Sequence, residues 1–595
     1  MTAILCLTPA ALDTARAIKA HLPGAALHGL AGRVPEADTL FTDATAHIRT
    51  LFAQGQAIIG VCAAGILIRA IGALLADKQA EPPVLAVSPD GKSVVPLLGG
   101  HHGANQLARR LALALAGQAA ITTAGDLALG LALDEPPPGW KVGTPDAVKP
   151  VTAALLAGAR VRLEVEAGSA EWLSGLPTAE DGQPLVRVTD HAVATDEDEL
   201  LLHPPVLALG VGCERNCPPD ELAELVERTL AESGLAADAV ACVASVDLKM
   251  DEPAVLRLAE RLGVPARFFS PARLAEEGPR LANPSEVVAR EIGCPGVSEG
   301  AALAAAGADS TLVVEKTKSK RATVALARAT DCIDPATVGR ARGRLWVVGI
   351  GPGTAGWRAP QASAAIAQAT DLVGYGLYLD LLGEAAHGKT RHESDLGAEA
   401  DRARKALDLA GQGHDVALIC SGDAGIYALA TLVFELMDRE RKPEWLRAEI
   451  RVVPGISALQ AAAARAGAPV NHDFCTISLS DLLTPWETIE KRLKAAAEAD
   501  FVVCFYNPVS KRRRDQLARA RDILLTGRPP ETPVILARQL GRPEESLRVV
   551  HLGDLTPDDA DMLTIIIVGS SETRQLDAGG AKWVYTPRGY AKKLS

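Results

Sequence analysis

The stretch V-V-G-I-G-P-G-T-A-G-W, residues Val347–Trp357, is an apolar run that breaks into glycines after more than half of the chain. A strand that ends in a glycine-rich loop is typical of a place where the backbone approaches a phosphate or a nucleotide. A dinucleotide fits this loop poorly, because the third glycine of that fingerprint falls on Thr354 and Pro352 lacks the backbone N–H that a pyrophosphate needs. The loop therefore predicts a ligand site on an α/β fold without identifying the ligand.

Four later stretches share the pattern of an apolar strand whose end carries Gly, Pro, Asn or Ser. They are V-A-L-I-C-S-G-D-A-G-I-Y (Val416–Tyr427), V-V-P-G-I-S-A-L-Q-A-A-A-A-R (Val452–Arg465), D-F-V-V-C-F-Y-N-P-V-S-K-R-R-R (Asp500–Arg514) and M-L-T-I-I-I-V-G (Met562–Gly569). Small ligands bind at the carboxyl ends of strands in parallel sheets. Asp423, taken alone, is more often the N-cap of the helix that follows it.

Length and composition bound the class of protein. A chain of 595 residues exceeds the size of one hydrophobic core, about 250–300 residues, so several domains are expected. Hydrophobic residues make up 48% and charged residues 23%, which is typical of an ordered globular protein. The net charge of −12 argues against a nucleic-acid-binding protein but leaves room for a local basic pocket.

The ten cysteines and the amino-terminal segment favour a cytoplasmic protein. Cys213 and Cys217 form a C-x-x-x-C pair, but no second Cys/His pair stands at zinc spacing, so we expect small buried thiols and no metal. The chain opens with a strand-then-helix pattern and without a basic leader. The uncharged run from Thr50 to Ile68 contains glycines and glutamines, and we interpret it as strand A-I-I-G-V-C, turn and helix.

Alternating strands and helices divide the chain into an α/β, multidomain protein. The predicted domains are 1–133, a small linking domain 134–204 after a Pro/Gly-rich boundary, a third unit 205–330, a polar linker 331–343 and a final domain 344–592. The final domain would have lobes at about 344–450 and 451–592.

The carboxyl-terminal motifs resemble the tetrapyrrole methylases, and within them the precorrin-3B carbon-17 methyltransferases. The resemblance covers about 344–592 and rests on V-G-I-G-P-G, S-G-D-A-G-I-Y, V-P-G-I-S-A, I-S-L-S-D-L-L-T-P-W-E and Y-N-P-V-S-K-R-R. Ala424 stands where the family usually has a proline. The resemblance implies a two-lobed class III methyltransferase fold with S-adenosylmethionine between the lobes, a tetrapyrrole substrate, and commonly a homodimer.

The resemblance also implies roles for particular residues. The residues that would line the cofactor are Asp423, Ile426, Tyr427, Ser457, Ala458, Tyr506, Asn507 and Thr564. Gly351, Pro352 and Gly353 would border the tetrapyrrole rather than a phosphate. A precorrin carries many carboxylate arms, so cationic side chains should converge on it; the candidates are Lys511, Arg512, Arg513 and Arg538. The alternative for the K-R-R-R run is a solvated helix face.

The first half of the chain resembles the cobalt-precorrin-5A hydrolases over about 1–330. In the first domain the motifs are G-V-C-A-A-G-I-L-I-R-A-I-G, V-V-P-L-L-G-G-H-H-G-A-N-Q-L-A-R-R and A-I-T-T-A. In the third unit they are L-G-V-G-C-E-R-N-C, S-V-D-L-K-M-D-E, G-V-S-E-G-A-A-L and L-V-V-E-K-T-K-S-K-R-A-T-V-A-L-A-R. This resemblance implies α/β hydrolase-like domains that open a lactone and release a two-carbon unit as acetaldehyde.

Lactone opening needs an activated water and a stabilised leaving alkoxide. His101 is the candidate base, and Lys249, Glu299 and Lys316 could bind carboxylate arms or move protons. For each of these residues a structural role, such as a salt bridge or a cap, is the competing interpretation.

The sequence thus predicts a bifunctional cobalamin-pathway enzyme that methylates precorrin-3B, or its cobalt form, at carbon 17 with ring contraction and deacylates the product. Two alternatives stay open. In one, the first half is a non-catalytic tetrapyrrole carrier; in the other, the Val347 loop serves a nicotinamide-dependent oxidoreductase. Neither nucleic acid nor membrane is an expected partner.

Overall fold

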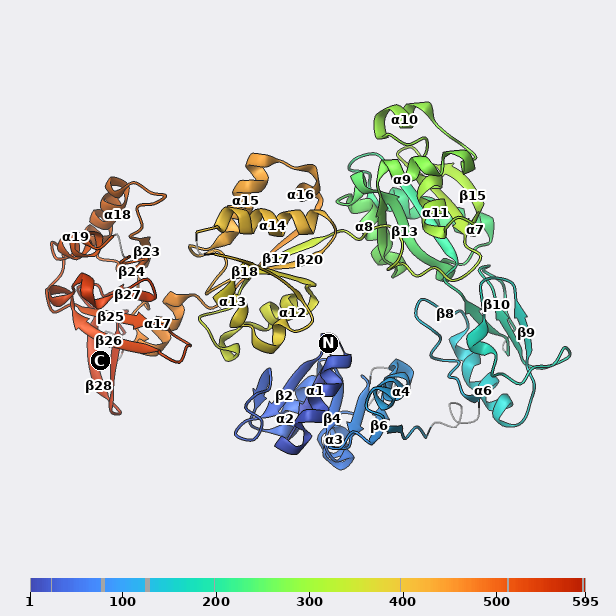
Figure 1. Ribbon diagram of the computed structural model, residues 1–595, viewed down its shortest axis with the longest axis horizontal. Coiled ribbons are helices and arrows are strands. Elements are labelled where there is room, and N and C mark those ends of the chain that lie inside the picture. Colours follow the sequence, from blue (N-terminus) through green and yellow to red (C-terminus); the bar gives the residue numbers. More distant parts are fainter. Residues whose placement is uncertain are drawn as a thin grey trace. The chain divides into compact units, whose positions relative to one another are not determined.

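The computed structural model describes residues 2–22, 24–75, 81–122, 129–196, 198–395, 397–510, 513–590 and 593 (Figure 1). The chain forms two compact units. The first contains Met1–Arg344 together with Ala410–His414 and Pro443–Glu449, and the second contains Leu345–Leu409, Asp415–Lys442 and Ile450–Ser595. The predicted mixed α/β, multidomain architecture is confirmed, whereas the domain boundaries stay a prediction.

The first sheet has seven strands in the order β3-β2-β1-β4-β5-β6-β7. The strands are β1 (Thr2–Cys6), β2 (Ala26–Leu30), β3 (Thr39–Phe41), β4 (Ala57–Val61), β5 (Val84–Val87), β6 (Ser93–Leu98) and β7 (Gln118–Ala119). Helices α1 (Leu12–His21), α2 (Ala44–Ala53), α3 (Ala64–Ile71) and α4 (Ala104–Ala114) connect them. The uncharged run from Thr50 to Ile68 is the end of α2, the buried strand β4 and the start of α3, which confirms the predicted strand and helix.

Two histidines meet between strand β2 and helix α2. His28 on β2 is 8% exposed, and its Nδ1 lies 2.8 Å from Nε2 of His47 on α2. The His47 ring also stacks on Phe41, with 4.5 Å between centroids. Burial, and next the nearby His47, lower the pKa of His28 to about 4, although the charge of Asp38 opposes the shift.

Acidification from pH 7 to pH 5 is expected to destabilise this sheet by about 2 kcal/mol. The pKa of His28 is about 4 in the folded chain and 6.5 in the unfolded chain. Below pH 6.5 the unfolded chain therefore binds a proton that the folded chain does not bind. The stabilisation is complete above pH 6.5 and falls as the pH drops toward 4. Hydrogen exchange of the β2 amides at both pH values, corrected for intrinsic rates, measures it.

The control for this prediction is His21, which is exposed at the end of α1. The variant His28→Gln should lose most of the difference between pH 7 and pH 5, and His21→Gln should keep it. An undiminished pH dependence in His28→Gln would contradict the assignment.

The second sheet is small and has the order β8-β11-β10-β9. Its strands are β8 (Lys141–Val142), β9 (Arg162–Val165), β10 (Leu185–Val188) and β11 (Leu200–His203), and α6 (Val148–Leu156) accompanies them. Its core is built from apolar side chains that include Trp140, Val151 and Leu202.

The third sheet has the order β14-β13-β12-β16-β15. The strands are β12 (Leu207–Cys213), β13 (Val240–Val246), β14 (Ala266–Phe269), β15 (Thr311–Lys318) and β16 (Ala322–Arg328). The helices are α7 (Pro219–Ser233), α8 (Pro253–Leu262), α9 (Pro271–Glu276), α10 (Glu286–Ile292) and α11 (Ser298–Ala306). Strands β12, β13 and β14 are parallel, and β16 runs antiparallel to β12. Helix α11 lies directly on β12, because a Cβ on Gly210 would come within 1.9 Å of the Ser298 carbonyl oxygen.

The segment 331–343, predicted as a linker, follows the edge of this sheet. Arg340 and Phe268 exchange backbone hydrogen bonds of 2.9 Å, and Nε of Arg267 donates to the Val338 carbonyl at 2.7 Å. Ile333 is 8% exposed and joins the core beneath β13. Backbone bonding rather than composition fixes this polar segment in place.

The fourth sheet has the order β19-β18-β20-β17-β21. The strands are β17 (Arg344–Gly349), β18 (Asp371–Tyr375), β19 (Thr390–Ser394), β20 (Asp415–Cys420) and β21 (Glu449–Val453). The helices are α12 (Pro360–Gln368), α13 (Gly376–Asp380), α14 (Glu399–Gly411), α15 (Leu429–Glu440) and α16 (Pro443–Arg447). This order makes β17, which leads into the Val347 loop, the neighbour of both β20 and β21.

The last large sheet has the order β23-β24-β27-β25-β26, and a three-stranded sheet, β22-β29-β28, accompanies it. The large sheet contains β23 (Phe474–Ser478), β24 (Val502–Tyr506), β25 (Pro533–Arg538), β26 (Ser546–His551) and β27 (Thr564–Val568). The small one contains β22 (Gly467–Ala468), β28 (Arg574–Ala578) and β29 (Ala581–Tyr585). The helices are α17 (Ala458–Ala466), α18 (Trp486–Glu498) and α19 (Asp515–Leu524). Within the described ranges, no helix is both long and apolar enough to cross a membrane.

Candidate functional site

Three strand ends of the fourth sheet meet through their glycines. A Cβ on Gly349, at the end of β17, would lie 2.7 Å from the Gly422 carbonyl oxygen and 2.9 Å from the Gly455 nitrogen. A Cβ on Gly455 would lie 2.2 Å from the Gly422 oxygen and 2.6 Å from the Gly349 oxygen. Real Cβ atoms do not approach backbone atoms this closely, so the loops after β17, β20 and β21 pack in a way that only glycine permits.

The Val347 loop is held by backbone contacts on both sides. Gly351 has a φ of +76° and exchanges hydrogen bonds with Gly422, at 3.1 and 2.8 Å. A Cβ on Gly353 would lie 2.4 Å from the Gly541 carbonyl oxygen, and Nε of Arg542 donates to the Pro352 carbonyl at 3.4 Å. Gly351, Pro352 and Gly353 therefore form a tight turn that joins the β20 loop to the Gly541 loop.

The Asp423 carboxylate connects the loop after β20 to the loop after β21. Its Oδ1 accepts a hydrogen bond from the Gly425 nitrogen at 2.8 Å, and its Oδ2 accepts one from the Gly455 nitrogen at 3.0 Å. Helix α15 begins only at Leu429, so Asp423 is not its N-cap. Hydrogen bonds to a carboxylate are stronger than those between neutral groups, so Asp423 fixes the spacing of the β20 and β21 loops.

Two tyrosines, one after β20 and one at the end of β24, face each other beside the glycine junction, the name used here for the packing of Gly349, Gly422 and Gly455. The rings of Tyr427 and Tyr506 lie 5.0 Å apart. Tyr427 has a φ of +51° and is 52% exposed, and its hydroxyl donates to the Thr476 carbonyl at 3.1 Å. The Tyr506 hydroxyl accepts from the Leu459 nitrogen at 3.2 Å, and burial raises the pKa of this phenol, so it stays neutral. The pair offers an aromatic, uncharged surface to a ligand.

Ser457 and Ala458 begin helix α17 next to Tyr506. The Ser457 Oγ accepts from the Gln460 nitrogen at 3.2 Å, and Gln460 Oε1 accepts from the Ser457 nitrogen at 2.9 Å. Ser457 is 1% exposed, so its hydroxyl serves the helix start, whereas Ala458 is partly accessible. Ile426, partly exposed, lies in the loop between Asp423 and Tyr427.

Asn507 follows β24 and is tied to the end of β23. It has a φ of +51°, and its Nδ2 donates to Ser478 Oγ at 3.2 Å. The Arg513 guanidinium is 8% exposed and donates to the carbonyls of Asn507 and Leu479, at 2.9 and 2.6 Å. Arg513 is therefore a clamp between two loops. The predicted substrate ligands Lys511 and Arg512 lie outside the described residues.

Thr564 and Arg538 lie opposite each other on β27 and β25 and share Asp561. Thr564 is 6% exposed and donates to Asp561 Oδ1 at 2.7 Å. Nε of Arg538 donates to Asp561 Oδ2 at 2.8 Å, and Glu544 lies 3.7 Å from the same guanidinium. Arg538 thus already has two carboxylate partners, which the spacing of its own motif did not reveal.

Most of the carboxyl-terminal candidate residues therefore form one cluster, and Thr564 lies beside it. The cluster surrounds the glycine junction and consists of Asp423, Ile426, Tyr427, Ser457, Ala458 and Tyr506, with Gly351 and Pro352 at its border. Thr564 stands two residues before Ile566, which pairs with Phe505 on β24. The cluster offers backbone groups, hydroxyls and aromatic faces, which suits a ligand that must be oriented rather than ionised.

The loop before helix α4 contains the His101 candidate of the first half of the chain. The loop before α4 contains Gly99 and Gly103, both with positive φ, and the Gly103 nitrogen donates to Glu135 Oε1 at 3.4 Å. The His101 side chain lies outside the described residues, so its predicted role as a base stays a prediction.

Glu299 and Lys316 of the third sheet bind the same loop. Glu299 is 1% exposed and accepts hydrogen bonds from the Asn283 nitrogen, Asn283 Nδ2 and the Lys316 nitrogen, at 2.9, 3.0 and 2.9 Å. Burial raises the pKa of Glu299, but these bonds outweigh it and leave the pKa below its ordinary value. Nζ of Lys316 donates to the Asn283 carbonyl at 2.6 Å. Both side chains thus fasten the Asn283 loop.

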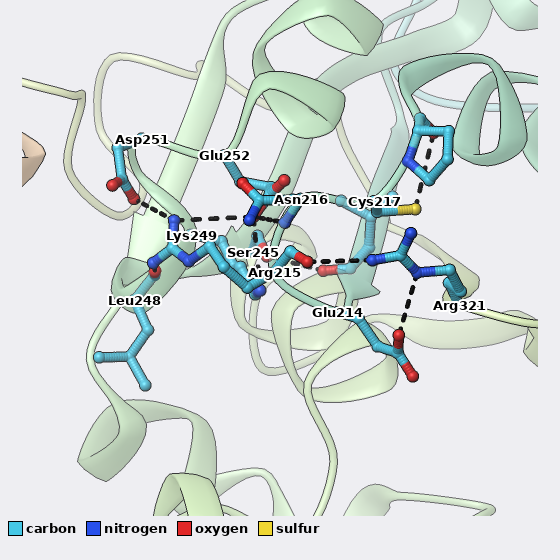
Figure 2. A network of polar contacts seen from close by, with 12 residues as sticks. Glu214, Arg215, Asn216, Cys217, Ser245, Leu248, Lys249, Asp251, Glu252 and Arg321 are labelled. Atoms are coloured by element: carbon cyan, nitrogen blue, oxygen red, sulfur yellow. Dashed lines mark hydrogen bonds and ion pairs between the residues drawn. The ribbon is translucent and has the colours of Figure 1, made fainter.

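Lys249 belongs to a separate network at the ends of β12 and β13 (Figure 2). Its Nζ lies 3.6 Å from Oε2 of Glu252, a carboxylate with no exposed surface. Among the described residues, no hydrogen bond or ion pair joins Lys249 to Glu299 or Lys316. Sequence reasoning missed Glu252, although the motif S-V-D-L-K-M-D-E contains it. In the part of the chain that the structure describes, no three His, Cys, Asp or Glu side chains gather as a metal site.

Three family models match the chain. Residues 344–556 match the model described as Tetrapyrrole (Corrin/Porphyrin) Methylases. Residues 46–126 match Cobalamin synthesis G N-terminal, and residues 207–327 match Cobalamin synthesis G C-terminus. The glycine junction lies in the first match and Glu252 in the last. The matches define an α/β protein that joins a methylase domain to two cobalamin synthesis G domains.

The chain belongs to the tetrapyrrole methylase family. It is 46% identical over 250 residues to the precorrin-3B C(17)-methyltransferase of Sinorhizobium sp, a match that covers 42% of this chain and 98% of that protein. It is 45% identical over 252 residues to the cobalamin biosynthesis protein CobIJ of Mycobacterium tuberculosis (strain ATCC 25618 / H37Rv), which covers 42% of this chain but only 48% of CobIJ. The chain therefore spans about half the length of this relative. The crystal structure of the methyltransferase CobJ is 45% identical and is covered completely by 41% of this chain, with a TM-score of 0.39.

Proposed function

We propose that the carboxyl-terminal domain transfers a methyl group from S-adenosylmethionine to carbon 17 of precorrin-3B, or of its cobalt form, with contraction of the ring. One observation carries the proposal: the match to the Sinorhizobium precorrin-3B C(17)-methyltransferase extends over 98% of that protein at 46% identity. The gathering of Asp423, Tyr427 and Tyr506 around the glycine junction supports it.

The residues of the junction suit a sulfonium methyl donor. Such a donor supplies its own leaving group, so the protein needs neither a metal nor a strong base and contributes orientation. Asp423 holds the β20 and β21 loops at a fixed spacing, and the Tyr427 and Tyr506 rings supply an uncharged wall for a cationic ligand. The cofactor site would be completed by Ile426, Ala458, Asn507 and Thr564. The macrocycle would be bordered by Gly351, Pro352 and Gly353.

We further propose that the cobalamin synthesis G domains open the lactone that ring contraction leaves behind and release its two-carbon unit as acetaldehyde. Their matches at residues 46–126 and 207–327 support this role. A shared chain would raise the local concentration of the intermediate. We also propose that the protein acts as a cytoplasmic homodimer.

Mass spectrometry of the products that the full chain forms from precorrin-3B and S-adenosylmethionine tests both steps. A methylated, deacylated tetrapyrrole together with trapped acetaldehyde is expected. A product that is methylated only would reject deacylation and favour a carrier role for the first half. No methylated product, together with binding of NAD, would reject the proposal in favour of an oxidoreductase.

A further inference from the structure

The carboxyl edge of β12 and β13 has the placement of a ligand site. The two strands run parallel, with Leu209 paired to Val243, so the loops that follow them, 214–217 and 247–252, leave the sheet at the same edge (Figure 2). Ligands of open parallel sheets bind at this edge. The Asn216 backbone adopts a φ of +57° there and donates its N–H to Oε2 of Glu252 at 3.2 Å.

Glu252 differs from Glu299, another buried glutamate beside this sheet. Glu299 accepts three hydrogen bonds from protein groups, which explains its burial structurally. Glu252 has no exposed surface and accepts one, while its Oε1 has no hydrogen-bond partner in the described structure. An incompletely bonded carboxylate costs free energy when buried, so packing alone does not account for Glu252.

Two cations approach Glu252, and Arg215 is the one that protein acceptors already hold. Arg215 lies 3.6 Å from Glu252 and is held by Asp251 at 2.7 Å and the Leu248 carbonyl at 2.8 Å. Lys249 also lies 3.6 Å from Glu252, and its side chain is 13% exposed. Among the described residues no acceptor lies within hydrogen-bond distance of its ammonium group. Lys249 thus presents unused donors at the edge of the sheet.

The nearby thiol does not compete with Lys249 for a chemical role. Burial raises the pKa of Cys213 to about 12, even though the Lys249 charge acts in the opposite direction. A neutral thiol is a poor nucleophile. The Lys249 ammonium group, rather than the thiol, is therefore a candidate to meet an anionic ligand.

We propose that Lys249 binds an anionic oxygen of the tetrapyrrole and that Glu252 is the positioning residue that fixes the Lys249 ammonium group. The inference rests on the proposed deacylation by the first half of the chain. Two oxygens share the required chemistry: a carboxylate of an acetate or propionate arm, and the alkoxide formed on lactone opening. In that opening, water adds to the lactone carbonyl carbon, the ring C–O bond breaks, and the proton of the water ends on the released oxygen.

The test uses the full chain and a methylated tetrapyrrole lactone as the probe, with the variants Lys249→Met, Lys249→Arg and Glu252→Gln. Lys320→Met, in the exposed turn between β15 and β16, is the matched control. Visible absorption titration gives the Kd of the lactone, and acetaldehyde trapping gives the single-turnover rate. Thermal unfolding confirms that each variant is folded.

A bound carboxylate arm predicts that Lys249→Met raises the Kd at least about tenfold and leaves the rate at saturation unchanged. A developing alkoxide predicts an unchanged Kd and a rate at least about 100-fold lower. In either case Lys249→Arg should restore part of the loss, Glu252→Gln should change the same parameter as Lys249→Met, and Lys320→Met should resemble the parent chain.

Equal Kd and rate values in Lys249→Met and Lys320→Met would overturn the inference. If the parent chain releases no acetaldehyde, the proposed deacylation fails, and the Kd comparison alone decides whether Lys249 binds the tetrapyrrole. The two failures are therefore distinguishable.

Discussion

Replacement of Gly455 by alanine is expected to reduce methyl transfer by at least about 100-fold. The new Cβ would lie 2.2 Å from the Gly422 carbonyl oxygen and 2.6 Å from the Gly349 oxygen, so the three loops must separate by about 1 Å to accept it. That displacement lies at the proposed donor site, where a small misplacement of reacting groups is costly. The methylation rate of the full chain, measured with precorrin-3B and S-adenosylmethionine, gives the result.

Gly356 provides the matched control for this substitution. It lies in the loop after β17, whereas Gly455 follows β21, and a Cβ added to Gly356 would meet no atom within 4 Å. Gly356→Ala should therefore methylate at the parent rate. Equal activity in Gly455→Ala and Gly356→Ala would show that the close approach of the loops does not support the reaction.

The second large effect is expected from Asp423→Ala, which should weaken binding of S-adenosylmethionine about 100-fold. The substitution removes the acceptors for the Gly425 and Gly455 nitrogens, at 2.8 and 3.0 Å, and each charge-assisted hydrogen bond contributes about 1.5 kcal/mol or more. Without them, the loops after β20 and β21 lose their fixed spacing. Isothermal titration with S-adenosylmethionine measures the change.

Asp438 is suited as the control, because its side chain is 86% exposed and pairs only with Arg441 within the described structure. Asp438→Ala should bind the donor as the parent chain does. If Asp423→Ala binds equally well, Asp423 is only a local turn former.

The strands β17, β20 and β24 were predictable from the sequence because each is largely an apolar run. Val347, Val416 and Val502 all lie in strands that the pattern indicates, and the glycines after the first two mark the loops of the candidate site. The strand order β20-β17-β21 was not predictable, and this order is what brings Gly349, Gly422 and Gly455 together. The resemblance to known motifs predicted which residues belong to the cluster, whereas the contacts between them became visible only in the structure.

The partners of charged residues were not predictable, because they lie far away in the sequence. Arg538 pairs with Asp561, 23 positions later, and its role in binding a carboxylate arm stays a prediction. Asp251 and Glu252 are adjacent, yet the Asp251 side chain is 31% exposed and that of Glu252 is buried. No local pattern distinguishes these two carboxylates, so the Lys249 network became visible only in the structure.

The most direct test of the methyltransferase assignment is calorimetric titration of the full chain with S-adenosylhomocysteine, with NAD as the comparison ligand. We expect one site per chain that binds S-adenosylhomocysteine. Binding at this site should be weaker in Asp423→Ala and should show no competition from NAD. Absence of heat with S-adenosylhomocysteine, or displacement of it by NAD, would contradict the assignment of the glycine junction to a sulfonium donor.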